Sequence, residues 1–163
     1  MNATADADYA AAVAQSHGRD VSIDWWTRGG APGPSYTSDK LTVVSHAGLT
    51  RATYIRARFD LAYDKNFRAV EYSAAVNRPE ADALIAALDG DRLFARHLAA
   101  EDRGNLADGV KDTITVELDR RRFEKTLIAV TPAELAHAAA VRNRLVQMVM
   151  QGSKGRDLNA RRP

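Results

Sequence analysis

The sequence contains no cysteine in its 163 residues. A chain without thiols can form neither a disulfide framework nor a thiolate metal site, and it has no cysteine nucleophile. This absence fits a reducing compartment. The length is sufficient for one domain with a substantial hydrophobic core, so we expect packing to hold the fold together.

The short motifs that accompany common reactions are also missing. The sequence has no lysine-containing phosphate loop, no nucleophile elbow and no pair of histidines with zinc-ligand spacing. The one group of acid–base residues is His97 with Glu101 and Asp102, in a polar stretch that predicts a loop. We expect a protein that is not an enzyme and that has no cofactor and no metal. An unfamiliar enzymatic site around His97 is an alternative.

Long apolar runs and a strong net charge are absent too. No stretch approaches the roughly 20 apolar residues that cross a bilayer, and the first residues lack the pattern of a secretory signal. We expect a cytoplasmic protein without a membrane span, with a processed secreted form left open. The net charge is +2, and the segment from Arg142 to the end is basic, whereas the rest of the chain is mildly acidic. The predicted domains are a helical extension at 1–19, a single domain at 20–152 and a basic flexible tail at 153–163.

Strand and helix signals follow one another clearly along the rest of the chain. Alternating or β-prone residues predict strands at 21–26, 40–45, 49–59, 67–76, 113–118 and 123–130. Alanine-rich or capped segments predict helices over 4–16, from Asn77 to Gly90 and from Thr131 to Gly152. The expected fold is α+β: an antiparallel sheet of about six strands with two main helices packed on one face, plus a short N-terminal helix.

The segment from Trp25 to Tyr36 has the most unusual composition, because it holds both tryptophans and several glycines and prolines. This composition predicts a shaped loop after the first strand, and such loops often carry recognition. If the strand continues, Trp25 and Trp26 point to opposite faces, so that one is in the core and the other is available to a partner. The expected partner is another protein. The predicted binding residues are Trp26, Arg28, Gly29, Gly30, Pro32, Gly33 and Tyr36.

Arginines provide an alternative binding surface. Several of them lie on neighbouring predicted strands and three more lie at a predicted hairpin tip. Sheet faces with basic and aromatic residues bind single-stranded nucleic acids. A nucleic-acid-binding protein with an arginine-rich sheet face and a basic tail is therefore the competing prediction. Its candidate residues are Arg56, Arg58, Arg120, Arg121 and Arg122.

The layout of part of the chain resembles a known family. A strand leads into Arg28-Gly29-Gly30-Ala31-Pro32-Gly33, and a helix rich in alanine and leucine, two strands and a proline-initiated helix follow later. This layout resembles the emfourin-like family of small bacterial protein inhibitors of metallopeptidases. The proline-rich loop, the extra strands between Leu49 and Val76 and the terminal extensions differ from the family. The resemblance implies a protein-binding module of inhibitor, immunity or accessory type, whose glycine loop contacts its partner.

Overall fold

A computed structural model describes residues 3–30, 35–60, 68–94, 111–128 and 135–159. These residues form an α+β fold, as the sequence predicts, with seven strands where about six were expected. The elements in chain order are α1 (Ala3–Gln15), β1 (Val21–Gly30), β2 (Ser35–His46), β3 (Leu49–Asp60), β4 (Arg68–Ala75), α2 (Arg78–Gly90), β5 (Lys111–Leu118), β6 (Arg121–Ile128), α3 (Ala136–Gly152) and β7 (Arg156–Asp157).

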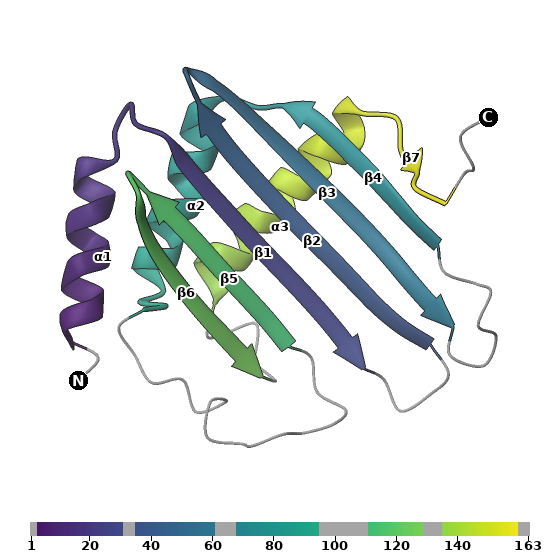
Figure 1. The fold of residues 1–163 in the computed structure, drawn as a ribbon, viewed down its shortest axis with the longest axis horizontal. Coiled ribbons are helices and arrows are strands. Elements are labelled where there is room, and N and C mark those ends of the chain that lie inside the picture. Colours follow the sequence, from purple (N-terminus) through teal and green to yellow (C-terminus); the bar gives the residue numbers. More distant parts are fainter. Residues whose placement is uncertain (1–2, 31–34, 61–67, 95–110, 129–134, 160–163) are drawn as a thin grey trace.

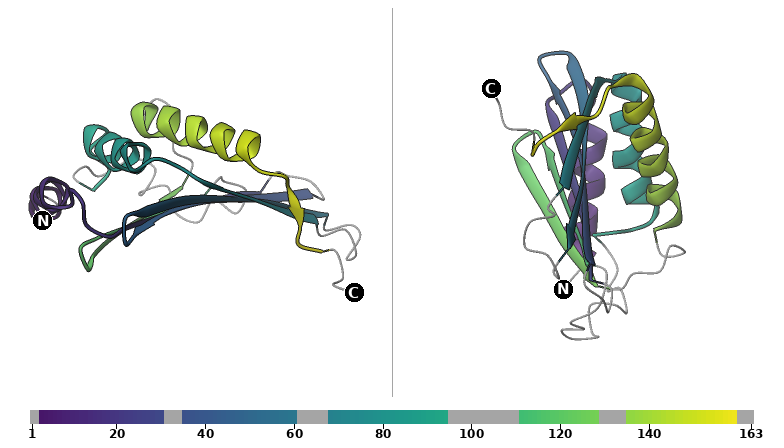
Figure 2. Two further views of the ribbon diagram at one scale, coloured as in Figure 1. Left: turned by 90° about the horizontal axis from the view of Figure 1, so that it is seen from above. Right: turned by 90° about the vertical axis from the view of Figure 1, so that its right-hand side faces the viewer.

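All seven strands belong to one antiparallel sheet, in the order β6-β5-β1-β2-β3-β4-β7 (Figure 1). Figure 2 shows α2 and α3 over one face of this sheet. We call this face, which carries Ile23, Trp25 and Leu41, the helix-side face. The other face, which carries Trp26 and Lys40, is the open face. It is turned toward the viewer in Figure 1.

The core lies between the helix-side face and the two helices. Successive strand residues point to opposite faces, so the apolar positions of β1 and β2 fall on one side. Ile23 and Val43 are fully buried there. Leu84, Leu88 and Leu145 are also fully buried, and they come from the apolar stripes of α2 and α3. Leu84, Ile85 and Leu88 thus form the core-facing stripe of α2.

Helix α1 packs against this core through an aromatic cluster. The Tyr9 ring is fully buried, and its centroid lies 4.6 Å from that of Phe94 and 5.1 Å from that of Phe123. Its hydroxyl donates to the Ile85 carbonyl oxygen at 3.0 Å. Burial raises the pKa of this hydroxyl, so Tyr9 stays neutral. In an N-terminal helix made mostly of alanine, Tyr9 is thus the largest contact with the core, beside Ala12 and Val13.

Two tight turns join the paired strands of the β2–β3 and β5–β6 hairpins. The residues of both turns have positive φ angles. Ala47 and Gly48 join β2 to β3 with φ of 51° and 80°. Asp119 and Arg120 join β5 to β6 with φ of 47° and 70°. Two-residue turns of this kind match the twist of the paired strands.

The described part of α3 begins at Ala136, and an acidic residue from the end of α2 satisfies its first amides. Asp91 is buried, and its carboxylate accepts hydrogen bonds from the backbone N–H groups of His137 and Ala138, at 3.3 and 2.8 Å. The predicted cap at Thr131 lies outside the described residues. Sequence reasoning missed Asp91, because it is 46 residues away from His137 in the chain.

The segment after α3 contributes to the sheet, whereas the sequence predicts a flexible tail. Arg156 and Asp157 pair with Glu71 and Val70 as strand β7. Asn159 adds a hydrogen bond from the Ala69 backbone N–H to its side-chain oxygen, at 2.8 Å. Polarity in this segment reflects a short, solvent-exposed edge strand, which a search for apolar alternation cannot detect.

None of the helices in the described ranges is both long and apolar enough to cross a membrane.

Candidate functional site

The segment with both tryptophans forms a hairpin rather than a loop over most of its length. Strand β1 continues through Gly30, which pairs with Tyr36 of β2. The predicted loop after the first strand is therefore wrong for residues 27–30 and 35–36, because ladder pairing with β2 outweighs the conformational freedom of Gly29 and Gly30. Pro32 and Gly33 lie outside the described residues.

The two tryptophans point to opposite faces, as predicted for a continuing strand. Trp25 is 3% exposed on the helix-side face, while Trp26 is 38% exposed on the open face. The Trp26 indole Nε1 donates a hydrogen bond to Ser38 Oγ at 2.7 Å. Its orientation on the surface is therefore fixed.

Cations surround Trp26 on the open face. The Arg28 guanidinium carbon lies 3.7 Å from the centroid of the indole ring, which is a cation–π contact. Lys40 is directly opposite Trp26 on β2, and Lys111 is directly opposite Arg28 on β5. We call Trp26, Arg28, Lys40 and Lys111 the Trp26 patch. No carboxylate in the described ranges forms an ion pair with Arg28 or Lys111.

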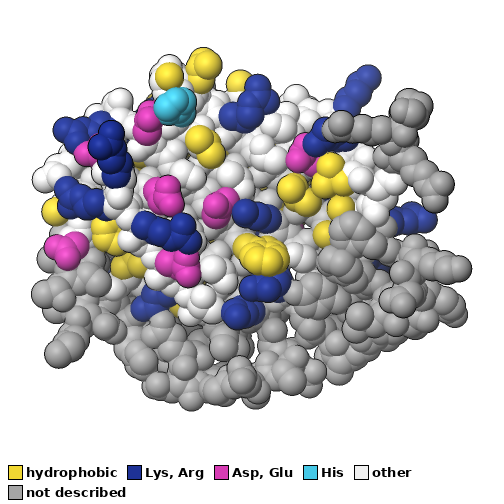
Figure 3. Space-filling model, in the orientation of Figure 1, with side chains coloured by type: hydrophobic (Ala, Val, Ile, Leu, Met, Phe, Trp, Pro, Cys, Tyr) yellow, Lys and Arg dark blue, Asp and Glu magenta, His cyan; other side chains and the backbone are white. Residues whose placement is uncertain are grey.

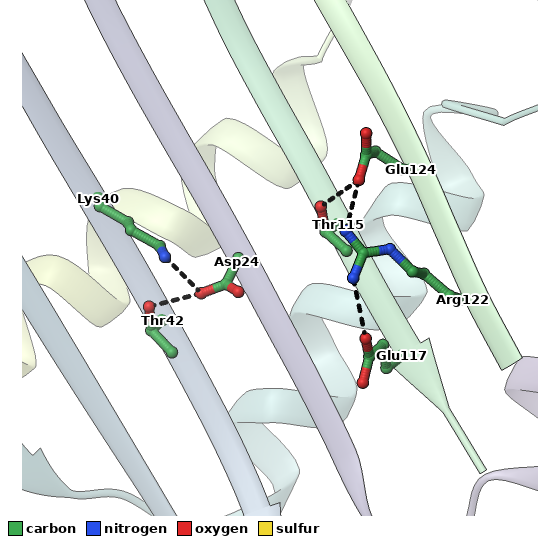
Figure 4. A network of polar contacts seen from close by, with 7 residues as sticks. All are labelled: Asp24, Lys40, Thr42, Thr115, Glu117, Arg122 and Glu124. Carbon is green, nitrogen blue, oxygen red and sulfur yellow. Dashed lines mark hydrogen bonds and ion pairs between the residues drawn. The ribbon is translucent and has the colours of Figure 1, made fainter. Parts of the chain in front are cut away.

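Elsewhere on the open face several charges are paired. Figure 3 shows positive and negative side chains interspersed over this face. Arg122 lies between Glu117 and Glu124, with N–O distances of 3.3 and 2.7 Å. The Glu124 pKa is lowered by the hydrogen bond and the positive charge of Arg122. Asp24 accepts from Thr42 at 2.6 Å and lies 3.4 Å from Lys40 (Figure 4).

The arginines predicted to bind nucleic acid do not form one surface. Arg122 is held by carboxylates on β6, and Arg121 donates to the Gln15 side chain of α1. Arg120 lies in the turn between β5 and β6. Arg56 and Arg58 belong to β3, four positions from β6 in the strand order and on the helix-side face. The structure thus places Arg56 and Arg58 far across the sheet from Arg120–Arg122, and Arg122 also lies on the opposite face.

A polar row crosses the helix-side face where the apolar core ends. The pairing register aligns Asp112, Thr27, Asp39, Arg56 and Val70 on five neighbouring strands. Because strand side chains alternate, this row is on the same side as Trp25 and Leu41.

Asp39 is the best-satisfied member of the polar row. Its carboxylate lies 2.9 Å from an Arg142 nitrogen of α3, and it accepts a hydrogen bond from the Tyr54 hydroxyl at 3.1 Å. Burial and the neighbouring Asp39 raise the pKa of Tyr54. Asp39, Tyr54 and Arg142 thus tie α3 to two strands.

Asp112 is less well satisfied. Burial raises the pKa of its carboxyl, and the hydrogen bond from Thr27 and the charge of Arg142 offset this only in part. Within the described ranges, Asp112 Oδ1, Trp25 Nε1 and Arg142 Nε are buried without a hydrogen-bond partner. Trp25 Nε1 lies near the Asp112 carboxyl and helps to offset its raised pKa, so this end of the core holds polar groups that are only partly satisfied.

Beyond the polar row lies a cavity of about 410 Å³. Its charged lining residues are Arg56, Arg58 and Arg68, which we call the arginine corner. Tyr72, Val70, Thr37 and Ala57 complete the lining. The sequence alone already predicts these arginines on neighbouring strands. Sequence reasoning missed Thr37 and Tyr72, since only the register of three strands shows that they share one face.

The remaining candidates from the sequence lie outside the described residues or lack a metal-binding arrangement. His97, Glu101 and Asp102 fall in the range 95–110, which the structure does not describe. In the ranges that it does describe, no three side chains of histidine, aspartate or glutamate gather as metal ligands would.

Comparison with known proteins gives no relative. No family model and no curated protein matches this sequence. The two candidate sites, the Trp26 patch and the arginine corner, are therefore interpreted from their own chemistry.

Proposed function

We propose that this protein is a non-enzymatic binding module whose Trp26 patch contacts a partner protein. The observation that carries the proposal is an exposed tryptophan held in one orientation by Ser38 and stacked with Arg28 at 3.7 Å. Tryptophan and arginine are the residues that contribute most often to the energetic centre of protein interfaces.

The charges around Trp26 define the chemistry of the partner. Arg28 and Lys111 face each other across neighbouring strands, and no described carboxylate neutralises them. Like charges directly opposite each other are unfavourable, and an acidic group of a partner relieves this repulsion. The matching surface is an acidic patch beside an apolar contact for the indole ring.

A protein partner is favoured over nucleic acid by the rest of the open face. Glu117, Glu124 and Asp24 lie among its cations, and they would repel a phosphate backbone. The role as a peptidase inhibitor, which the sequence resemblance implies, is one form of this proposal.

The experiment compares three forms of the whole chain in affinity capture from cells of the source organism, with quantitative mass spectrometry. They are the wild type, the double variant Trp26→Ala/Arg28→Gln and the control Val44→Ala. Val44 is 39% exposed on the same face, so it matches Trp26 in exposure. We expect a protein that the wild type and the control capture equally and the double variant loses.

The captured protein is then purified, and its affinity for all three forms is measured directly at several salt concentrations. We expect tenfold or weaker binding for the double variant, which is about the effect of one interface hot spot. Equal affinities for the wild type and the double variant would exclude the Trp26 patch. Capture of nucleic acid alone would favour the competing prediction.

A further inference from the structure

The arginine corner occupies a part of the helix-side face that the described helices leave uncovered. In Figure 1, α3 crosses behind the sheet toward the end of β4, away from the end of β3 and the start of β4. The cavity of about 410 Å³ lies at that corner. Its volume is typical of small-molecule sites and is larger than a single inorganic ion requires.

Two of the three arginines face each other directly. Arg58 of β3 pairs in register with Arg68 of β4, and Arg56 is two residues before Arg58 on the same face. Cross-strand like charges destabilise a sheet. In the described ranges, no carboxylate forms an ion pair with Arg56, Arg58 or Arg68.

The nearest carboxylate across the sheet does not neutralise this corner. Asp39 is opposite Arg56 in the register, but its oxygen is bound by Arg142 and by the Tyr54 hydroxyl. Within the described ranges, the three arginines therefore concentrate positive charge in one cavity without an ion-paired carboxylate. Guanidinium groups recognise phosphate through paired N–H donors, and several together suit a group that carries more than one negative charge.

The cavity also has a flat apolar wall. The Tyr72 ring stacks on the Tyr54 ring, with a centroid distance of 6.5 Å and an interplanar angle of 26°. Gly155 packs closely against Val70 and Tyr72, since a Cβ atom added there would lie 2.7 Å and 2.9 Å from their side chains. Tyr72 and Val70 are thus fixed in place, ready to contact a planar group.

We propose that the arginine corner binds a small phosphorylated molecule whose planar part rests against Tyr72. The phosphate group lies between Arg58 and Arg68, with Arg56 as the third cation. This site is separate from the Trp26 patch, because the two are on opposite faces of the sheet. A nucleic-acid strand is disfavoured, since the predicted basic residues Arg120–Arg122 lie at the opposite edge of the sheet.

The first test measures the thermal unfolding of the whole chain at low salt with increasing pyrophosphate. Sodium chloride of matched ionic strength serves as the reference. The variants are Arg58→Gln and Arg68→Gln, with Arg51→Gln as the control. Arg51 lies on the same strand but on the open face, where it donates to Ser73 at 3.2 Å.

We expect a saturable rise in melting temperature for the wild type and for Arg51→Gln. Arg58→Gln and Arg68→Gln should lose most of this rise. Without an anion they should melt at a higher temperature than the wild type, because the repelling pair is removed. A rise of equal size in all four forms, or one that chloride reproduces, would overturn the proposal.

The second test uses isothermal titration calorimetry with inorganic phosphate, AMP and a single-stranded 12-nucleotide DNA. We expect AMP to bind more tightly than phosphate. Each glutamine variant should bind AMP about tenfold more weakly or worse, because one charge-assisted contact is lost.

Arg58→Lys keeps the charge without the paired donors, and it should fall between the wild type and Arg58→Gln. Circular dichroism checks whether each variant folds. If a glutamine variant does not fold, Arg58→Lys still tests the proposal. Tighter binding of the DNA than of AMP, dependent on the same arginines, would overturn the small-molecule assignment. Failure of either test leaves the function proposed for the Trp26 patch unaffected.

Discussion

The two faces of the sheet carry their charges differently. On the open face several cations have a carboxylate neighbour, as Arg122 has in Glu117 and Glu124, while Arg28 and Lys111 of the Trp26 patch have none within the described ranges. On the helix-side face an apolar core changes to a polar row, and then to three arginines without described partners. Solvent allows surface pairs to form at little gain or cost, whereas buried or clustered charges are costly. Arg56, Arg58 and Arg68 are exposed, so the cost at this corner comes from the clustering of like charges rather than from burial.

The adjacent tryptophans give the largest expected contrast between the faces. Trp25→Ala removes a buried ring beside the Arg142 guanidinium, and should lower the free energy of unfolding by about 3–5 kcal/mol. Trp26→Ala removes a surface ring and should cost about 1 kcal/mol or less. Urea denaturation of both variants measures the difference. Equal losses would mean that the faces do not differ in burial as described.

Asp112 gives the next contrast, through the dependence of stability on pH. Burial raises its pKa above the ordinary value of 3.8, so the unfolded chain releases this proton first as the pH rises. The contribution of Asp112 to the free energy of unfolding is therefore most favourable below pH 3.8. It is lost as the pH rises through the raised pKa.

Asp112→Asn should unfold at higher urea than the wild type at pH 7, and its stability should fall less between acidic and neutral pH. Urea midpoints measured at several pH values test this prediction. A variant that is less stable than the wild type at pH 7 would show that the charged carboxylate is favourable in the fold.

Glu124 on the open face should show the opposite sign and the smallest effect. Arg122 lowers its pKa below the ordinary value of 4.5, so the stability that it adds is present above pH 4.5 and lost on acidification. Because this pair is exposed, Glu124→Gln should lower the unfolding midpoint only slightly at pH 7, and less in high salt. The same series of urea midpoints measures it, and a stabilising effect at neutral pH would contradict the pairing.

Period-two alternation was sufficient to predict the α+β class and the separation of Trp25 from Trp26. It failed where strand pairing outweighed local composition, as at Gly29 and Gly30, and where a strand was too short and polar to show alternation, as at Arg156. The Asp91 cap depends on contact between residues far apart in the chain. The arginine corner depends on the register of β3 with β4, which composition alone does not define.

Alternate residues of β3 lie on opposite faces of the sheet and serve different surfaces. Arg51, Thr53 and Ile55 belong to one face, while Tyr54, Arg56 and Arg58 belong to the other. Inserting one residue after Tyr54 would leave the composition almost unchanged and yet move both arginines to the opposite surface. For this strand, tolerance to substitution should differ between odd and even positions. The arginine corner therefore depends on the spacing of residues along β3 as well as on their identity.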